Sequence, residues 1–433
     1  MNRIILIGNG FDLAHGMKTR YSDFIADYWN NVINEVVNRI KTNYTSIPGR
    51  FENEEIIINN LPGQYIGDVH FQAANFEELK QNLKQIESGI KFKNQFLQLL
   101  TIKHNELSWV DIEVEYYTLL KNSFKNSPTK YSIKDLNNDF RSVKILLENY
   151  LIKIENEFKE SFESKSSYRK IKNAIGFQIY APLSYRDIDE ASLAEKAKFE
   201  FESLQNDLSD ISQGFKKLEN LNSKRQYLIK RLRENANIND IRKLLVAGDA
   251  INYFDLNPNE ILFLNFNYTL TEEIYRYSTE FETYESLRDI VRKVIHIHGT
   301  TDKYDKNDVI FGFGDELDKD YREIEDLHDN DYLENVKSIK YMETDNFKEL
   351  LQFINSDKYQ IFIMGHSCGV SDRTLLNTLF EHKNCASIKP FYYKIDDESD
   401  NYSDLVRNIS RNFNSKALMR DKVVNKKYCT PLK

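Results

Sequence analysis

Short apolar runs lie near the two ends of the chain, and long amphipathic stretches fill the part between them. RIILI (3–7) is a β-branched run that stops at a glycine, which is typical of a buried parallel strand. Similar runs follow late in the chain: ILFLNF (261–266), KVIHIH (293–298), DVIFGF (308–313), QIFIMG (360–365) and FYYKI (391–395). Each is separated from the next by enough residues for a helix or a crossover loop. This alternation predicts an α/β protein with a doubly wound, Rossmann-like parallel sheet.

The middle of the chain has the pattern of helices. Apolar residues recur at three- and four-residue steps over 142–163 and 194–245, with charges of both signs on the opposite face. We expect long paired helices here, and a further helix near Tyr21-Ser22-Asp23-Phe24. Residues 43–75, which include Pro48 and Pro62, are expected to be irregular. The sequence thus predicts one sheet domain interrupted by a large insertion: 1–28 carries the first strand and a nucleotide loop, 29–245 is mainly helical, and 246–433 completes the sheet.

Composition narrows the class of protein without naming a function. No apolar run approaches the ~20 residues that cross a bilayer, and the N-terminal run is too short for a secretory segment, so we expect a cytoplasmic protein with no membrane contact. The cysteines, Cys368, Cys385 and Cys429, form no C-x-x-C pair, which argues against a disulfide framework and a thiolate zinc site. The net charge of −8 leaves nucleic-acid binding unsupported.

Polar residues follow several of the predicted strands. Two glycines at the first turn, Gly8 and Gly10, permit close backbone approach, so that amides could face a phosphate near a helix start. The full G-x-G-x-x-G spacing is missing, and an ordinary strand-to-helix turn is the alternative. Asn265–Thr269, His296–Thr300 and Gly365–Ser367 follow three later strands. Because the carboxyl ends of parallel strands share one edge, we expect these clusters to line one crevice.

Several ordered blocks resemble the signature of a known family. GNGFDLAHGMKTRYSDF, LNFNYTLTEEI, IHIHGT, VIFGFGDE and GHSCGVSD are similar to blocks of the AbiH family of bacterial abortive-infection proteins. They cover the N-terminal end and most of 258–382, and the middle matches only loosely around 109–113. The resemblance implies a role in defence against phage.

The same blocks resemble, more distantly, the sirtuin-like NAD-consuming fold. That resemblance implies that Asn267 holds the nicotinamide ribose or a water, that His298 is the general base, and that Ser367 contacts a ribose or phosphate. It also implies a nucleotide-binding set made of Gly8, Asn9, Gly10, Phe11, Asp12, His15, Thr19, Tyr21, Gly299, Gly365, Ser367 and Asp372. The sirtuin zinc cysteines are absent, so protein deacylation is not expected. Thr269 replaces an aspartate, and Asn9 and Asp12 replace small residues, which leaves open whether the ligand is NAD and whether it is cleaved.

The residues also suit glycohydrolase chemistry on general grounds. Cleavage of the nicotinamide–ribose bond passes through an oxocarbenium-like state, which needs an anchored substrate, a polar group near the ribose and a base for water. The glycine turn, Asn267 and His298 supply these roles, and Asp12 either stabilises positive charge or caps the first helix. We therefore predict an abortive-infection effector that hydrolyses NAD, with NAD as substrate or ligand. No metal is expected, since a site from His15, Asp12, His298 and Asp372 has no H-x-x-x-H spacing.

Other functions remain open at this stage. Gly365-His366-Ser367-Cys368-Gly369 matches a G-x-S-x-G nucleophile elbow, but the required order Ser, acid, His is not met, because the histidine that follows, His382, ends a helix that starts beside the serine. A second alternative is a nucleotide-binding switch without turnover. A third is a nuclease or nucleotide hydrolase that uses Asp12, Asp111, Glu113 and Asp372, although Asp111 and Glu113 more often are solvated or cap a helix.

The insertion bears on the expected partners. It is either a helical scaffold or dimerisation arm, or a surface that senses a partner. We expect a homo-oligomer formed through it, and a phage-derived or host protein as the trigger.

Overall fold

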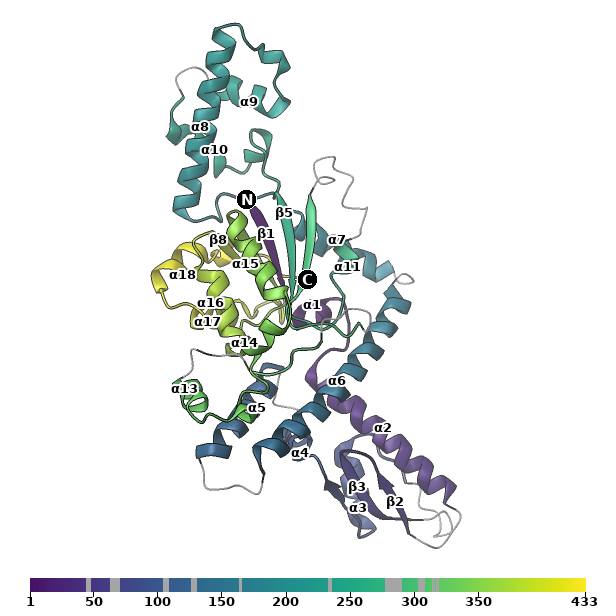
Figure 1. Cartoon of the computed structure of the whole chain (residues 1–433). Helices are drawn as coiled ribbons and strands as arrows, with labels where there is room; N and C mark the ends of the chain where they lie inside the picture. The colour runs from purple at the N-terminus through teal and green to yellow at the C-terminus, as the bar shows by residue number, and fades with distance from the viewer. Residues whose placement is uncertain are drawn as a thin grey trace.

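A parallel five-stranded sheet forms the centre of the protein (Figure 1). The computed structural model describes the whole chain apart from residues 44–47, 63–70, 104–108, 126–130, 163–165, 233–235, 277–289, 303–307, 314–315 and 317–318. The strand order is β6-β5-β1-β7-β8, and each neighbouring pair is parallel. The bounds are β1 Asn2–Ile7, β5 Glu260–Asn265, β6 Val291–His296, β7 Tyr359–Met364 and β8 Cys385–Phe391. The predicted Rossmann-like α/β class is confirmed.

Helices cover both faces of the sheet, which is why its central strands carry apolar residues on both faces. Along β1, Ile4 and Leu6 face one apolar core with α15 (Asn346–Ser356), α16 (Arg373–Glu381) and α17 (Tyr402–Arg411). Ile5 and Ile7 face the opposite core, with α1 (Asn9–Ala14), α7 (Ser166–Ile179) and α11 (Glu273–Arg276). Two short helices, α14 (Lys337–Lys340) and α18 (Lys416–Lys422), and α13 (Lys319–Glu325) complete the C-terminal part.

Two predicted strands differ from the structure. DVIFGF (308–313) is not a strand, and within the described residues it forms an isolated bridge from Phe313 to Val336. Aromatic stacking holds it instead: Phe311 lies on Phe140 and Phe313 on Tyr117, with ring centroids 4.7 and 3.9 Å apart. The last strand is β8, so FYYKI (391–395) begins where that strand ends. β8 is an edge strand and contains Pro390, so its sequence is less typical of a strand than the FYYKI run that follows it.

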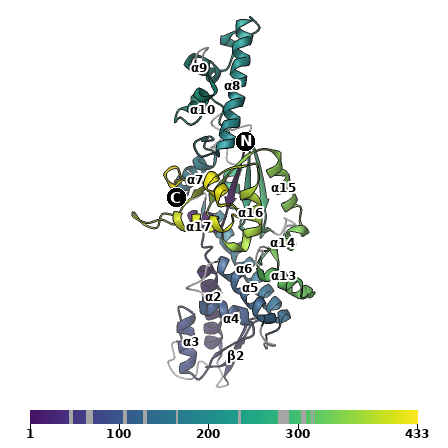
Figure 2. The same cartoon turned by 90° about the vertical axis from the view of Figure 1, so that its left-hand side faces the viewer.

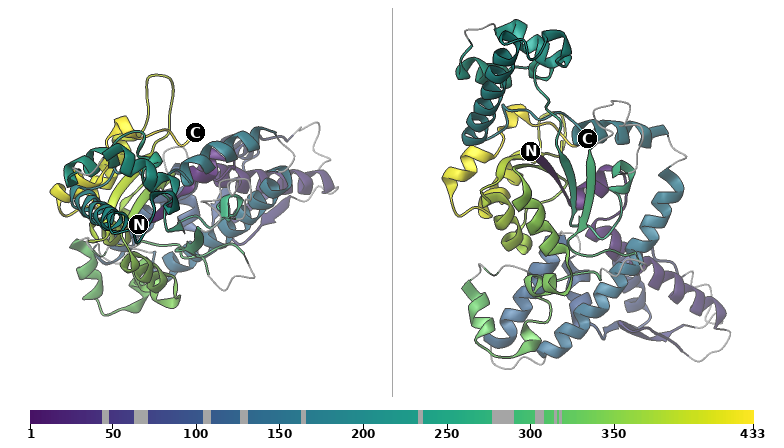
Figure 3. Two further views of the ribbon diagram at one scale, coloured as in Figure 1. Left: turned by 90° about the horizontal axis from the view of Figure 1, so that it is seen from above. Right: turned by 45° about the horizontal axis from the view of Figure 1, so that its top comes forward.

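The chain between β1 and β5 folds at both ends of the sheet. One part packs around a single apolar core beyond the carboxyl ends of the strands, and its helices are α2 (Tyr21–Thr42), α3 (Phe76–Gln85), α4 (Gln95–Lys103), α5 (Trp109–Lys125) and α6 (Ile133–Phe162). The other part, α8 (Glu190–Ser212), α9 (Ser223–Leu232) and α10 (Ile238–Leu245), has its own core and extends from the opposite end (Figure 2). Figure 3 shows these teal helices and the purple-blue ones on opposite sides of the sheet.

The helices of the middle region largely follow the sequence pattern. α2 begins at Tyr21 as predicted, and α6 covers the expected 142–163 up to Phe162. The stretch 194–245 is broken into three α-helices and not one long pair. The expectation of an irregular segment over 43–75 is wrong where the structure describes it, because β2 (Gly49–Glu52), β3 (Ile56–Leu61) and β4 (Ile90–Phe92) form an antiparallel sheet. Asn and Glu residues in these short strands obscured their pattern. Among the described helices, none is long and apolar enough to cross a membrane.

Candidate functional site

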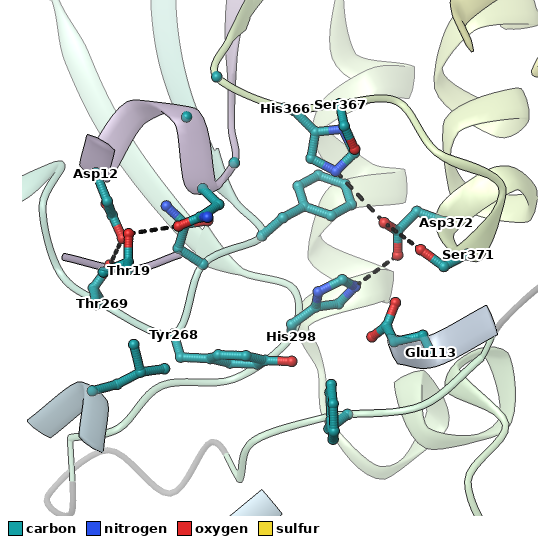
Figure 4. A pocket seen from close by; sticks show the side chains of 18 of the residues that line it. Asp12, Thr19, Glu113, Tyr268, Thr269, His298, His366, Ser367, Ser371 and Asp372 are labelled. Atoms are coloured by element: carbon teal, nitrogen blue, oxygen red, sulfur yellow. Dashed lines mark hydrogen bonds and ion pairs between the residues drawn. The ribbon is translucent and has the colours of Figure 1, made fainter. Parts of the chain in front are cut away.

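A cavity of about 270 Å³ lies at the carboxyl edge of the sheet (Figure 4). Loops that follow β1, β5, β6 and β7 form its walls, as the convergence of polar clusters predicts. The insertion adds Glu113 from α5 and Leu151 from α6. The remaining residues that line the cavity are Gly8, Asn9, Gly10, Asp12, Thr19, Phe266, Asn267, Tyr268, Thr269, His298, Phe311, Lys337, Gly365, His366, Ser367, Ser371 and Asp372.

The glycines at this edge allow two loops to pack against each other. Gly365 has φ +82°, and a Cβ there would lie 2.0 Å from the Phe11 nitrogen. A Cβ at Gly8 would lie 2.5 Å from the His366 Cα. The Gly10 amide donates to the Gly365 carbonyl at 2.8 Å, and the Phe11 amide donates to the Gly8 carbonyl at 2.8 Å. These two amides are therefore engaged within the protein and do not face the cavity as phosphate donors.

Asp12 is a buried carboxyl at one side of the cavity. Its two oxygens accept the hydroxyls of Thr269 at 2.7 Å and Thr271 at 2.8 Å. Burial raises the pKa of Asp12 to about 7, although these hydrogen bonds oppose the rise. The alternative role for Asp12, a side-chain cap on the first helix, is not seen, because no side chain caps α1.

His298 lies on the other side of the cavity in a polar cluster. Its Nε2 lies 3.2 Å from Asp372 Oδ1 and 3.0 Å from the Tyr341 hydroxyl. Burial, and then the nearby Lys337 ammonium, lower the pKa of His298 to about 4, so the imidazole is neutral at pH 7. A carboxylate can only accept, so the proton of a neutral His298 is on Nε2. The Nδ1 lone pair is left without a partner among the described residues.

Lys337 joins two carboxyl groups and was missed by sequence reasoning. Its Nζ lies 2.9 Å from Asp372 Oδ1 and 2.8 Å from Glu113 Oε1. The prediction that Glu113 is solvated or caps a helix is wrong, because it is buried in this cluster. Burial raises the pKa of Glu113 to about 7. Lys337 follows no predicted strand and sits in a four-residue helix, so no pattern in the sequence indicated it.

Burial raises the pKa of Asp372, but Lys337 and then His298 outweigh that effect and hold it well below its usual range. Asp372 precedes α16, as predicted, yet its side chain makes no cap and instead faces the cavity. Asp372 Oδ2 also lies 3.6 Å from His366 Nε2 and accepts the Ser371 hydroxyl at 3.3 Å.

The side chain of Asn267 carries a buried donor that forms no hydrogen bond of normal geometry, although it lies near Asp12. Its backbone amide donates to Asn265 Oδ1 at 2.8 Å, which fixes the loop after β5. The side-chain Nδ2 is buried and makes no hydrogen bond within the described structure. The amide lies near enough to Asp12 to favour its charged form. An orphaned buried donor on a cavity wall indicates a ligand or water acceptor.

The remaining predicted residues divide between the cavity and its surroundings. Asn9 and Thr19 line it and bond to each other at 2.6 Å. Ser367 is an exposed lining residue. Phe11, His15, Tyr21 and Gly299 lie outside the lining.

His15 supports the turn. Its Nδ1 lies 2.7 Å from the Phe11 carbonyl and its Nε2 2.5 Å from the Tyr275 hydroxyl. Burial lowers the pKa of His15 to about 4. His296 has a different partner from His298, since its Nε2 lies 3.0 Å from Glu272 Oε1.

The alternative sites considered from the sequence are not assembled in the described structure. For the nucleophile elbow, His382 stacks on the Tyr359 ring, with 6.1 Å between centroids, and the Tyr359 hydroxyl donates to the Leu379 carbonyl. His382 is therefore held in the α16 core and does not contact Ser367. The side chain of Asp111 lies outside the described residues. Within the described part of the chain, no three His, Cys, Asp or Glu side chains are grouped to hold a metal ion.

The sheet and its cavity define a Rossmann-like α/β protein with a ligand-sized pocket at the carboxyl edge. The family model for Bacteriophage abortive infection AbiH matches residues 4–394. The chain therefore belongs to the AbiH family, and its role is in phage abortive infection. No curated protein and no solved structure matches the chain.

Proposed function

We propose that this protein hydrolyses NAD to nicotinamide and ADP-ribose, and so depletes NAD in the cytoplasm of an infected cell. The observation that carries the proposal is the pairing of an orphaned buried donor, Asn267 Nδ2, with a neutral His298 in one cavity. The donor suits a ribose hydroxyl or a water, and the imidazole suits the proton of that water.

The size and charge of the cavity favour the nicotinamide end of NAD. Small-molecule pockets usually measure about 300–1,000 Å³, so 270 Å³ encloses a nucleoside-sized part of the ligand. Lys337 pairs with Glu113 and Asp372, whereas Asp12 has no cationic partner among the described residues. Such a lining suits the cationic pyridinium of oxidised NAD better than a polyphosphate.

The reaction needs little from the base at its start. The C1′–N bond breaks, and its electron pair neutralises the pyridinium nitrogen while positive charge moves to the ribose. The water oxygen then bonds to C1′, and His298 Nδ1 takes the water proton. A base with a low pKa is adequate because the oxocarbenium makes the attacking water acidic. Asp12 stabilises the developing positive charge in this scheme.

The test is release of nicotinamide from NAD by the purified protein. We expect His298→Ala to reduce the rate by about 100-fold or more, the usual contribution of general base catalysis. Asn267→Ala should reduce it through lost ribose contacts. His328→Asn is the matched control, because His328 is exposed, lies outside the cavity and has φ 53°, which Asn tolerates. Full activity in His298→Ala, or no release from the wild type with phage trigger present, would overturn the proposal.

A nucleotide-binding switch is the second candidate, and one observation favours it. Because α5 and α6 supply Glu113 and Leu151 to the cavity wall, a bound ligand would contact the insertion directly. Retained NAD binding without nicotinamide release would support the switch. For the nuclease alternative, Lys337 already neutralises Glu113 and Asp372, which leaves that pair less suited to a cation.

Control of a self-poisoning enzyme requires a resting state. We propose that a homo-oligomer formed through the helical insertion provides it, and that a phage-derived or host protein releases it. A wild-type protein that is monomeric and constitutively active would contradict this.

A further inference from the structure

Two basic side chains, Lys337 and His298, contact the same oxygen of Asp372. Lys337 Nζ lies 2.9 Å from Oδ1, and His298 Nε2 lies 3.2 Å from the same atom. Lys337 and Asp372 are almost completely buried, and His298 is 4% exposed. The ammonium of Lys337 repels a second positive charge on His298 so close to it in this buried cluster, so we expect only one of the two bases to be charged.

Glu113, the second partner of Lys337, favours a positive charge on Lys337 over one on His298. Glu113 Oε1 and Oε2 lie 2.8 and 2.9 Å from Nζ, so the ammonium has carboxylate contacts from α5 and from the start of α16. Among the described residues, His298 Nε2 contacts the shared oxygen and the Tyr341 hydroxyl. Burial disfavours the ammonium, but Asp372 and then Glu113 outweigh it and raise the pKa of Lys337.

The other groups that face His298 affect its charge less than Lys337 does. His366 packs against the Phe266 ring, with centroids 4.3 Å apart, and its Nε2 lies 3.6 Å from Asp372 Oδ2. It also lowers the pKa of His298, but by less than Lys337 does. Tyr341 stacks parallel to the His298 ring at 6.0 Å and Tyr268 lies at 6.5 Å. Burial raises the pKa of both tyrosines well above the usual value, so they are neutral.

We propose that Lys337 is a positioning residue that, as the counter-ion of Asp372, keeps the His298 imidazole neutral, with its proton on Nε2 and its Nδ1 lone pair toward the cavity. Without the ammonium, His298 would bind a proton from solvent at Nδ1, and the resulting imidazolium would pair with the Asp372 carboxylate. An imidazolium has no lone pair for a water proton. The catalytic consequence rests on the proposed NAD hydrolysis, whereas the charge state of His298 does not.

The experiment reads the charge state directly. Protein labelled with [¹⁵N]histidine is examined by long-range ¹H–¹⁵N correlation between pH 5.5 and 8, and His298→Asn assigns the signal. We expect the wild type to show the neutral Nε2–H tautomer throughout. Lys337→Met should give imidazolium shifts for His298 at pH 6, and Lys337→Arg should restore the neutral form.

Lys337→Met buries two carboxyls without a cation, so a charge-matched variant accompanies it. Lys337→Met/Glu113→Gln removes one charge of each sign and leaves Asp372 facing His298; the same imidazolium is expected. Glu113→Gln alone retains the ammonium and should leave His298 neutral. An imidazolium in the wild type, or a neutral His298 in both variants that lack Lys337, overturns the inference.

Nicotinamide release gives a second, separate readout. We expect Lys337→Met to be slowed about 100-fold at pH 6 and to recover as pH rises, while the wild type changes little. If the His298 shifts follow the prediction and no protein releases nicotinamide, the proposed function fails and the inference stands. If the wild type releases nicotinamide and Lys337→Met has the same pH profile, the inference fails alone.

Discussion

Asp12 has an unusual environment for a carboxyl group, because it is buried and its oxygens accept two threonine hydroxyls. The hydroxyls stabilise the anion, but burial is the larger effect and raises the pKa of Asp12 from 3.8 to about 7. A raised pKa means that the folded protein binds this proton more tightly than the unfolded chain. The stabilisation is complete below about pH 4 and is lost as pH rises to about 7.

Asp12→Asn should remove this pH dependence. We expect the free energy of unfolding of the wild type, relative to the variant, to fall by about 1.4 kcal/mol for each pH unit between about pH 4 and 7. Other buried groups, such as Glu113, titrate in both proteins and cancel in the difference. Denaturant titrations of both proteins at pH 5 and 7 check this. Parallel changes in the two proteins would show that Asp12 is not responsible.

The sequence predicted only some residues of the site, for a physical reason. Asn267, His298 and Ser367 follow strands, and the carboxyl edge of a parallel sheet brings such residues together. Glu113 and Lys337 reach the same cavity from helices, and their distance from the strands in sequence carries no periodic pattern. His15 and Tyr21 lie beside the predicted loop, yet their side chains pack away from the cavity.

At the scale of elements, the contact between the β1–α1 loop and the loop after β7 fixes the shape of the cavity. Gly365→Ala should be strongly destabilising, because the new Cβ would meet the Phe11 nitrogen at 2.0 Å in a left-handed backbone. Gly16→Ala is the matched control, since Gly16 has φ +83° and open space around it.

The control separates backbone strain from the clash. Gly16→Ala should cost about 1–2 kcal/mol, the usual penalty for a left-handed residue. Gly365→Ala should cost that amount and several kcal/mol more, or leave no folded protein to measure. Guanidinium unfolding of both variants gives the comparison, and equal losses would mean that the two loops separate freely.

Elements were predicted well where one pattern dominates. β1, β5 and β7 carry buried apolar residues on both faces, because helices cover both sides of the sheet. DVIFGF (308–313) has the same composition, but its aromatic rings stack on α5 and α6 and no neighbouring strand offers a ladder. Local sequence does not distinguish rings that pack on helices from rings that pack on a sheet.

At the scale of the whole molecule, the insertion forms two bodies with different relations to the cavity. The α2–α6 body touches it through Glu113 and Leu151, whereas the α8–α10 body has a separate core beyond the other end of the sheet. Phe199 and Phe215 on the α8–α10 body are 61% and 77% exposed. Exposed aromatics of this kind are common at protein interfaces.

The proposed homo-oligomer should depend on these side chains. We expect the double variant Phe199→Ser/Phe215→Ser to sediment as a monomer under conditions in which the wild type associates. Met342→Ser is the control, since Met342 is 78% exposed but lies outside the insertion. Unchanged association of the double variant would place the contact elsewhere, and a monomeric wild type would exclude the oligomer.

The position of β1 governs when a newly made chain can complete its pocket. β1 is the central strand, yet its partners β5 and β7 begin at residues 260 and 359. At roughly 5–20 residues per second of synthesis, β1 waits tens of seconds on the ribosome for a partner. The cavity needs Asp372 as well as Gly8, so a truncated chain that ends before β7 contains no complete pocket. Only a chain that extends through Asp372 can therefore form the complete pocket on which the proposed NAD hydrolysis depends.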